Sequence, residues 1–325
     1  MKYKYNFYNI LSVRSNIDLS DIVLPLDIFQ EKERRENYDL TIRKTKHTSI
    51  DKKIYQQIAP GLYYSEEEDR IASMRRIFGI KVYWEIVNLC GSQTELLFNK
   101  AYLLFFKHVF QFPISSFYQL NILIKMIMQI KLLLKNSTFL AGSAAAFEKK
   151  GIFFTGMNGS GKTTMILEFM ANFPSARYIS DDMTILSEGT VYSFPEPVRV
   201  RRFNLNARFF KKLENPVIKY RGRFREAFNG NFDVYFLEKS SANYINEISN
   251  SDGTSKLCSI NNRTLLYCSE RLLSSYAYYG ENFFLLNMQE RQSKILSDFF
   301  KDANFYILCA KNLFGYTEML KKRYK

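Results

Sequence analysis

A glycine-rich run, GMNGSGKTT at residues 156–164, constrains this chain more than any other part of its sequence. From Gly156 to Thr163 the run fits the pattern GxxxxGK followed by Ser or Thr, without a mismatch. The preceding GIFFT is typical of a buried strand, and the following TTMILEFMANF is typical of a helix. A strand, a glycine loop and a helix in this order indicate an α/β domain that binds a nucleoside triphosphate.

The residue types of this loop have a physical reason. Glycines let backbone N–H groups turn inward around a phosphate without a clash from a Cβ atom. The N-terminus of the following helix adds a partial positive charge. We expect Lys162 to reach the β- and γ-phosphates and the Thr163 hydroxyl to ligate Mg²⁺, a hard cation that prefers oxygen.

Two adjacent aspartates, Asp181 and Asp182, follow the β-like run RYI. In an extended backbone the two side chains would point in opposite directions, so one carboxylate could hold Mg²⁺ while the other acts as general base toward an acceptor hydroxyl. A bound cation and Lys162 would keep both carboxylates ionised. A turn at a strand end is the alternative use of such a pair, and the glycine loop favours the chemical one.

Four ordered segments carry a family resemblance: FLAGSAAAF, GIFFTGMNGSGKTT, RYISDDMTIL and GTVYSFPEPVRVR. Together they resemble the catalytic domain of the HPr kinase/phosphatase family, above all its diverged relatives in peptide biosynthesis, which include kinases of lasso-peptide precursors. The resemblance covers about residues 136–325 and implies a P-loop kinase domain with a fold similar to that of phosphoenolpyruvate carboxykinase. It also implies ATP and Mg²⁺ as the cofactors.

By position, the resemblance implies that Asp181 and Asp182 serve as catalytic base and metal ligand. We favour Asp181 as the base and Asp182, with Thr163, as the metal ligands, although the pattern leaves the assignment of the base open. Arginines of the family's later segment fall near Arg199, Arg201 and Arg202. The nucleotide-binding residues expected from the loop and this segment are Gly156, Asn158, Gly159, Ser160, Gly161, Lys162, Thr163, Thr164, Arg199 and Arg201.

The chain departs from the family at one position of the strand before the loop. Many members have a histidine there that contacts the catalytic acid, whereas this chain has Ser143 in the run SAAAF. A serine can hydrogen-bond a carboxylate but cannot carry a charge. Ser143 is therefore a candidate catalytic residue, and its presence leaves slow catalysis and lost catalysis both open.

A basic segment between residues 199 and 225 holds ten Lys or Arg residues and one acidic residue, Glu214. The segment could close over the ATP phosphates, dock an acidic peptide or another anion, or be a solvated face. The formal net charge of the whole chain is +14, but the lysines are spread and no aromatic–basic RNA-binding module is present. Nucleic acid is therefore a disfavoured partner.

The first 135 residues do not resemble the N-terminal domain of HPr kinase itself, so HPr is not expected as the substrate. We predict a smaller α+β domain over residues 1–135, with a role in substrate or partner recognition, and the kinase-like domain over residues 136–325. The apolar runs at 102–106 and 120–134 are too short or too interrupted to span a bilayer. Near the C-terminus we expect helices at 264–276 and 287–300.

Four scattered cysteines indicate free thiols in a reducing compartment, and two histidines leave little scope for a His-based metal site. With no apolar signal-peptide region at MKYKYNFYNI, we expect a cytoplasmic protein. The family resemblance also suggests self-association into a homo-oligomer.

These patterns favour an ATP-dependent kinase that phosphorylates a serine-type hydroxyl of a peptide or protein, such as a ribosomal-peptide precursor. One alternative is a nucleotide-binding regulatory or accessory protein with little turnover. Another is a kinase of a small molecule such as free serine.

Overall fold

The chain forms two units, Met1–Lys135 with Leu266–Arg291, and Asn136–Leu265 with Gln292–Lys325. Each unit is described by itself. The computed structural model describes residues 1–19, 29–31, 36–46, 49–51, 53–67, 69–106, 120–194, 198–201, 211–214, 216–265, 278 and 287–324. For residues 106, 198–201, 211–214, 216 and 263–265 it describes the backbone only.

The first unit is built on an eight-stranded mixed sheet with the order β1-β2-β3-β8-β7-β6-β5-β4. Its β2–β3 and β3–β8 pairs are parallel, and its other pairs are antiparallel. The strands are β1 (Tyr3–Phe7), β2 (Leu11–Ser15), β3 (Leu40–Thr45), β4 (Gln56–Ala59), β5 (Leu62–Ser65), β6 (Arg70–Ile77), β7 (Ile80–Val87) and β8 (Thr94–Asn99).

The described part of this unit also contains the helices α1 (Lys100–Phe106) and α2 (Leu120–Leu134). Strand β8 passes directly into α1 because the Asn99 side chain accepts a hydrogen bond of 2.8 Å from the Tyr102 backbone N–H, which caps the helix. The apolar run at 120–134 forms helix α2, and even its polar residues Gln129 and Lys131 are buried. None of the helices in the described part of the chain has the length and apolar character needed to cross a bilayer.

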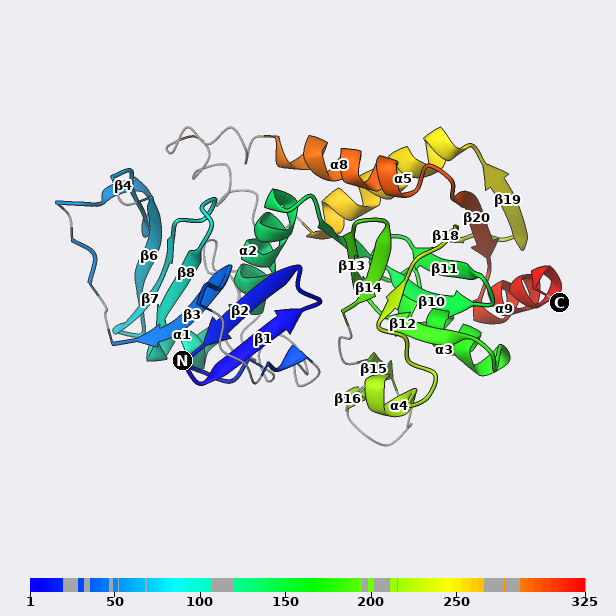
Figure 1. Cartoon of the computed structure of the whole chain (residues 1–325), viewed down its shortest axis with the longest axis horizontal. Coiled ribbons are helices and arrows are strands. Elements are labelled where there is room, and N and C mark those ends of the chain that lie inside the picture. The colour runs from blue at the N-terminus through cyan, green and yellow to red at the C-terminus, as the bar shows by residue number, and fades with distance from the viewer. Residues whose placement is uncertain are drawn as a thin grey trace. The chain divides into compact units, whose positions relative to one another are not determined.

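The second unit contains a six-stranded sheet with the order β12-β10-β11-β18-β20-β19, and a four-stranded antiparallel sheet with the order β17-β14-β13-β9 (Figure 1). In the larger sheet β11, β18 and β20 are parallel. The strands are β9 (Thr138–Ala141), β10 (Ser143–Phe147), β11 (Lys150–Thr155), β12 (Arg177–Ser180), β13 (Met183–Ser187), β14 (Thr190–Ser193), β15 (Val198–Arg201), β16 (Lys211–Glu214), β17 (Ala227–Phe228), β18 (Phe232–Lys239), β19 (Tyr244–Ile248) and β20 (Asn304–Ala310).

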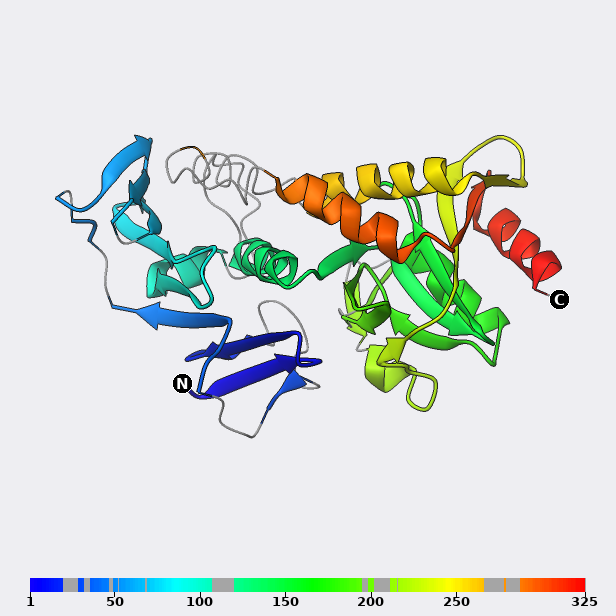
Figure 2. The ribbon, with the colours of Figure 1, turned by 45° about the horizontal axis from the view of Figure 1, so that its top comes forward.

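Helices cover both faces of the six-stranded sheet (Figure 2). Alternate side chains of each central strand point to opposite faces, so Phe154 and Tyr235 pack with α3 and α9, whereas Phe153 and Phe236 belong to the core beneath α5 and α8. The result is a three-layer α/β arrangement. The helices of this unit are α3 (Lys162–Asn172), α4 (Pro216–Lys219), α5 (Asn250–Leu265), α9 (Leu313–Arg323) and, from Gln292 onward, α8 (Met288–Phe299).

The run FLAGSAAAF does not form the single buried strand that its composition predicts. It divides at Gly142 into β9, which pairs with β13 in the smaller sheet, and β10, which pairs with β11 and β12 in the larger one. A Cβ atom on Gly142 would lie 2.3 Å from the Phe153 ring, so only glycine permits the close approach at which the chain changes sheets. The strand pair β12 and β13 changes sheets at the same place.

Two expectations near the C-terminus have different outcomes. The helix expected at 287–300 is confirmed as α8, whereas the helix expected at 264–276 falls almost entirely on residues outside the described ranges. Helix α5, which covers Asn250–Leu265, was not expected from the sequence. The α5 sequence is polar and contains Gly253, so its propensity alone did not reveal a helix that packs one buried side on the sheet.

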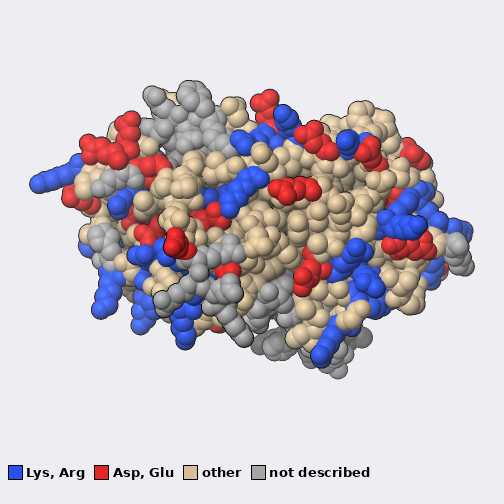
Figure 3. Space-filling view, viewed as in Figure 1, with Lys and Arg blue, Asp and Glu red and all other residues tan. Residues whose placement is uncertain are grey.

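Cysteine chemistry and surface charge follow the composition. Cys90, Cys258 and Cys309 are free thiols, and Cys268 lies outside the described ranges. Figure 3 shows acidic side chains interspersed among the basic ones over the face in view.

Candidate functional site

The glycine loop lies between β11 and α3 in the second unit. Gly161 is the N-cap of α3 and has a φ of 97°, in the left-handed region that glycine adopts without a steric penalty. Lys162, the first residue of the helix, is buried, and its Nζ donates to the Gly156 carbonyl at 2.9 Å and to the Met157 carbonyl at 3.3 Å. The Lys162 ammonium group therefore lies against the backbone of the loop that would surround a phosphate.

The two aspartates lie at the crossover between β12 and β13 and have opposite exposures. Asp181 is only 4% exposed and accepts a hydrogen bond of 2.5 Å from the Ser143 hydroxyl. Asp182 is exposed, with a left-handed φ of 72°. Its carbonyl accepts a hydrogen bond of 3.0 Å from the Gly142 N–H, which ties the two crossovers together. The extended backbone on which the predicted alternation of the two carboxylates depends is therefore not present, because the chain turns at Asp182.

Burial shifts the pKa values of Asp181 and Lys162. Desolvation raises the pKa of Asp181, while hydrogen bonds from Ser143 and Thr163 oppose the rise by stabilising the carboxylate. Desolvation also lowers the pKa of Lys162, and the nearby charges of Asp182 and Asp181 oppose that shift. Side chains from β10, the crossover and the start of α3 therefore meet within hydrogen-bonding or charge–charge range.

The remaining expected residues are distributed around this group. Thr164 is exposed in the first turn of α3, and Asn158 is exposed in the loop. Arg199 and Arg201 belong to β15, which pairs with β16, and their side chains are not described. Arg202 lies outside the described residues.

One arginine of the basic segment has a structural use that none of the three sequence-based interpretations included. Arg223 donates through Nη2 to the carbonyls of Met170 and Phe173 at 2.8 and 2.9 Å, and through Nε to the Ala176 carbonyl at 3.0 Å. These carbonyls belong to the end of α3 and the turn after it, where backbone acceptors lack intrahelical partners. Arg223 thus fixes the end of the helix whose start carries Lys162.

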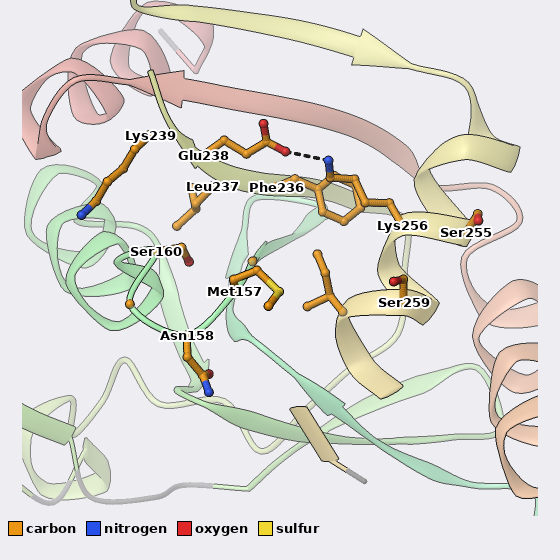
Figure 4. Close-up of a pocket in the computed structure, with 13 residues that line it drawn as sticks. Met157, Asn158, Ser160, Phe236, Leu237, Glu238, Lys239, Ser255, Lys256 and Ser259 are labelled. Atoms are coloured by element: carbon orange, nitrogen blue, oxygen red, sulfur yellow. Dashed lines mark hydrogen bonds and ion pairs between the residues drawn. The ribbon is translucent and has the colours of Figure 1, made fainter. Parts of the chain in front are cut away.

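A pocket of about 620 Å³ adjoins the loop on the side of α5 (Figure 4). Its walls are residues 156–160 of the loop, residues 236–239 at the end of β18, and one face of α5. Glu238 had two interpretations from sequence, as a polar group of the site or as a surface residue at a strand end. The structure places Glu238 in this wall, where its Oε1 forms an ion pair with Lys256 Nζ at a distance of 2.6 Å. The α5 wall was missed because the helix itself was not expected, although Ser255 and Ser259 show the i, i+4 spacing of one helix face.

The oxygen donors at the crossover fit a hard cation that binds a nucleotide. Thr163 offers a hydroxyl, and Asp181 and Asp182 offer carboxylates, which suits Mg²⁺ because it uses few protein ligands and takes others from substrate phosphates. Within the described ranges no three His, Cys, Asp or Glu side chains form a group able to hold a metal alone. In the loop, Ser160 Oγ is buried and has no hydrogen-bond partner among the described residues. Its hydroxyl is therefore available to donate to a phosphate oxygen.

No family model and no curated protein matches this chain. Among solved structures, it is similar to the HPr(Ser) kinase/phosphatase from Coxiella burnetii, with 10% sequence identity and a TM-score of 0.24. The match covers 34% of this chain and 77% of that chain. A TM-score this low carries no weight, so the function proposed below is inferred from the mixed α/β fold and the site alone.

Proposed function

We propose that this chain is an ATP-dependent kinase that transfers the γ-phosphoryl group to a serine-type hydroxyl of a peptide or protein. The observation that carries the proposal is a buried carboxylate, Asp181, held by Ser143 and Thr163 beside the lysine of a glycine loop. Phosphoryl transfer needs a base for the acceptor hydroxyl and positive charge around the phosphates, and this group of residues supplies both.

In this mechanism Asp181 accepts the proton of the attacking hydroxyl. Its raised pKa suits that role, because a carboxylate in a dry site is a stronger base than one in water. Ser143 holds the carboxylate by donating to its Oδ1. Lys162 leaves the loop carbonyls to contact the β- and γ-phosphates, which offsets charge on the transferring group.

Thr163 and Asp182 are the residues proposed to hold Mg²⁺. When bound, the ion supplies charge neutralisation on the phosphate oxygens. Asp182 suits this role because it is exposed, at a left-handed backbone position, whereas Asp181 is buried.

One observation favours a second candidate function, a nucleotide-binding regulator with little turnover. Ser143 gives Asp181 a neutral hydrogen bond and no charge, so the carboxylate lacks a cationic partner on that side. The two candidates differ in turnover and agree on nucleotide binding.

The test is phosphoryl transfer from γ-labelled ATP with Mg²⁺, offered to acidic and neutral serine peptides and to free serine. We expect transfer to a peptide that falls about 10²-fold or more in Lys162→Ala, by analogy with the loss of one charge-stabilising donor. Lys149→Ala is the matched control, since Lys149 is an exposed lysine of the turn before β11. ATP binding without transfer to any acceptor would favour the regulator, and transfer to free serine alone would favour a small-molecule kinase.

The role of Ser143 can be tested through the pH dependence of transfer. Its hydrogen bond lowers the pKa of Asp181, so Ser143→Ala should raise that pKa further. A base must be deprotonated to act, and activity is lost as pH falls through its pKa. We therefore expect the acid limb of the kcat/KM profile to move to higher pH in Ser143→Ala and to stay in place in Ser143→Thr, which retains the hydroxyl. An unmoved limb in the alanine variant would show that Asp181 is not the titrating base.

A further inference from the structure

The pocket beside the loop lies on the opposite side of β11 from the two aspartates. In the six-stranded sheet β11 separates β10 and β12 from β18: the aspartates follow the end of β12, and the end of β18 forms a pocket wall. Neither Asp181 nor Asp182 lines the pocket. An acceptor hydroxyl must reach a carboxylate, so the acceptor does not belong in this pocket if one of these aspartates is the base. The end of a nucleotide remote from the γ-phosphate has no such requirement.

The floor of the pocket is apolar and its rim is polar. Phe236 and Ile260 are buried beneath it, and Met157 of the loop is 51% exposed beside it. Figure 4 shows Glu238 and Lys256 on the upper wall and Ser259 on the α5 side. Ligand pockets of this size commonly combine apolar walls with a few polar groups that fix orientation. A nucleoside matches that combination, since it has a flat base and a sugar with two adjacent hydroxyl groups.

The ion pair on the rim holds a carboxylate in place to accept hydrogen bonds. Lys256 Nζ lies 2.6 Å from Glu238 Oε1 and 5.5 Å from the centre of the Phe236 ring. Both side chains remain partly exposed, at 35% for Lys256 and 43% for Glu238. A carboxylate at the edge of a nucleotide site is a common acceptor for ribose hydroxyls.

The loop connects this pocket directly to the phosphate site. Residues 156–160 line the pocket, and Lys162 and Thr163 follow at the start of α3. A Cβ atom on Gly156 would lie 2.8 Å from Ser160 Oγ and 3.0 Å from the Leu237 carbonyl, so the loop lies close against β18 at this point.

We propose that this pocket binds the nucleoside of the ribonucleoside triphosphate, with the ribose hydroxyls donating to Glu238 and the base packed against Ile260 and Met157. The proposal rests on the proposed function, because it assigns the second half of the same substrate. It makes Glu238 a binding residue that selects ribonucleotides.

Calorimetric titration with three probes in the presence of Mg²⁺ separates the two proposals. The probes are ATP, 2′-deoxy-ATP and inorganic tripolyphosphate, which lacks a nucleoside. For this protein we expect ATP to bind at least about 10-fold more tightly than tripolyphosphate, since a hydrogen bond to a charged group changes an affinity by about that factor or more. Glu238→Gln should weaken the binding of ATP about 10-fold and the binding of 2′-deoxy-ATP less. The binding of tripolyphosphate should not change.

A second variant fills the pocket without removing a hydrogen-bonding group from the loop. Ser259→Trp should reduce the affinity for ATP to that for tripolyphosphate, whose own affinity should not change. The matched control is Ser251→Trp, an exposed serine of the same helix that does not line the pocket, which should bind all three probes as the wild type does.

The outcomes are distinguishable. If neither ATP nor tripolyphosphate binds, the loop is not a phosphate site and the proposed function fails with the pocket proposal. If both bind with equal affinity and Ser259→Trp changes nothing, the pocket proposal alone is overturned. If Ser259→Trp leaves ATP binding intact but raises the KM for a peptide, the pocket is the acceptor site, which also overturns it.

Discussion

Asp181→Asn should lower phosphoryl transfer about 10³-fold while making the protein more resistant to heat. The loss follows because an amide cannot accept the proton of the acceptor hydroxyl, and general bases contribute about 10²- to 10⁴-fold. ATP affinity should change little, since Lys162 and the loop are retained. Single-turnover transfer and calorimetric ATP binding would measure the two effects.

The gain in stability follows from the raised pKa of Asp181. A raised pKa means that the folded protein binds the proton more tightly than the unfolded chain, so ionisation of this carboxyl destabilises the fold once the pH rises above the ordinary value of 3.8. The asparagine removes that cost, and a gain of about 1 kcal/mol would raise Tm by about 2–4 °C. The exposed Asp298→Asn of α8 is the control and should alter neither quantity. A variant that keeps its transfer rate would exclude Asp181 as the base.

Asp233→Ala should have the largest effect on stability, a loss of about 3 kcal/mol in the free energy of unfolding. Asp233 is 1% exposed at the start of β18 and accepts hydrogen bonds from the Asn304 amide at 2.8 Å and the Tyr324 hydroxyl at 2.9 Å. Lys150 Nζ contacts both carboxylate oxygens at 3.1 Å. Because the Lys150 side chain is 46% exposed, this ion pair contributes little to stability. Removing the carboxylate leaves the Asn304 amide and the Tyr324 hydroxyl without this acceptor.

Urea unfolding of the wild type, Asp233→Ala and Asp233→Asn would test this account. The asparagine retains one acceptor oxygen at the same position, so we expect it to recover part of the lost stability. A cost below about 1 kcal/mol for the alanine variant would show that the network is replaced by water. Transfer activity measured well below the unfolding midpoint should be unchanged, since Asp233 lies near the start of β18 and Glu238 lies near its end, about 17 Å away along the strand.

The strand–loop–helix arrangement at residues 150–172 could be predicted because local signals agree there. GIFFT is continuously apolar, the glycines suit positive φ, and the following run has a helical face. The proximity of Ser143 to Asp181 was expected only through the family resemblance, and the structure gives it a hydrogen bond. In these stretches sequence pattern and structure agree.

The change of sheets at Gly142 could not be predicted. An apolar run indicates that a strand is buried, but it does not indicate which strand is its pairing partner. The same limit hid the turn at Asp182, where alternation suggested an extended chain. Helix α5 was missed because its burial depends on one face of an otherwise polar segment. With α5 missed, the wall of the pocket that contains Lys256 was missed too.

The double crossover between the two sheets of the second unit has a consequence for how this site can vary. Ser143 begins one strand at the crossover, and Asp181 follows the end of another, so both are part of the sheet framework and not of a variable surface loop. Surface loops can change in length and sequence without moving these two groups. A substitution that alters the pairing of β9 or β10 would move both. The positions of Ser143 and Asp181 are therefore set by the sheet architecture, whereas the surface loops around them can vary independently.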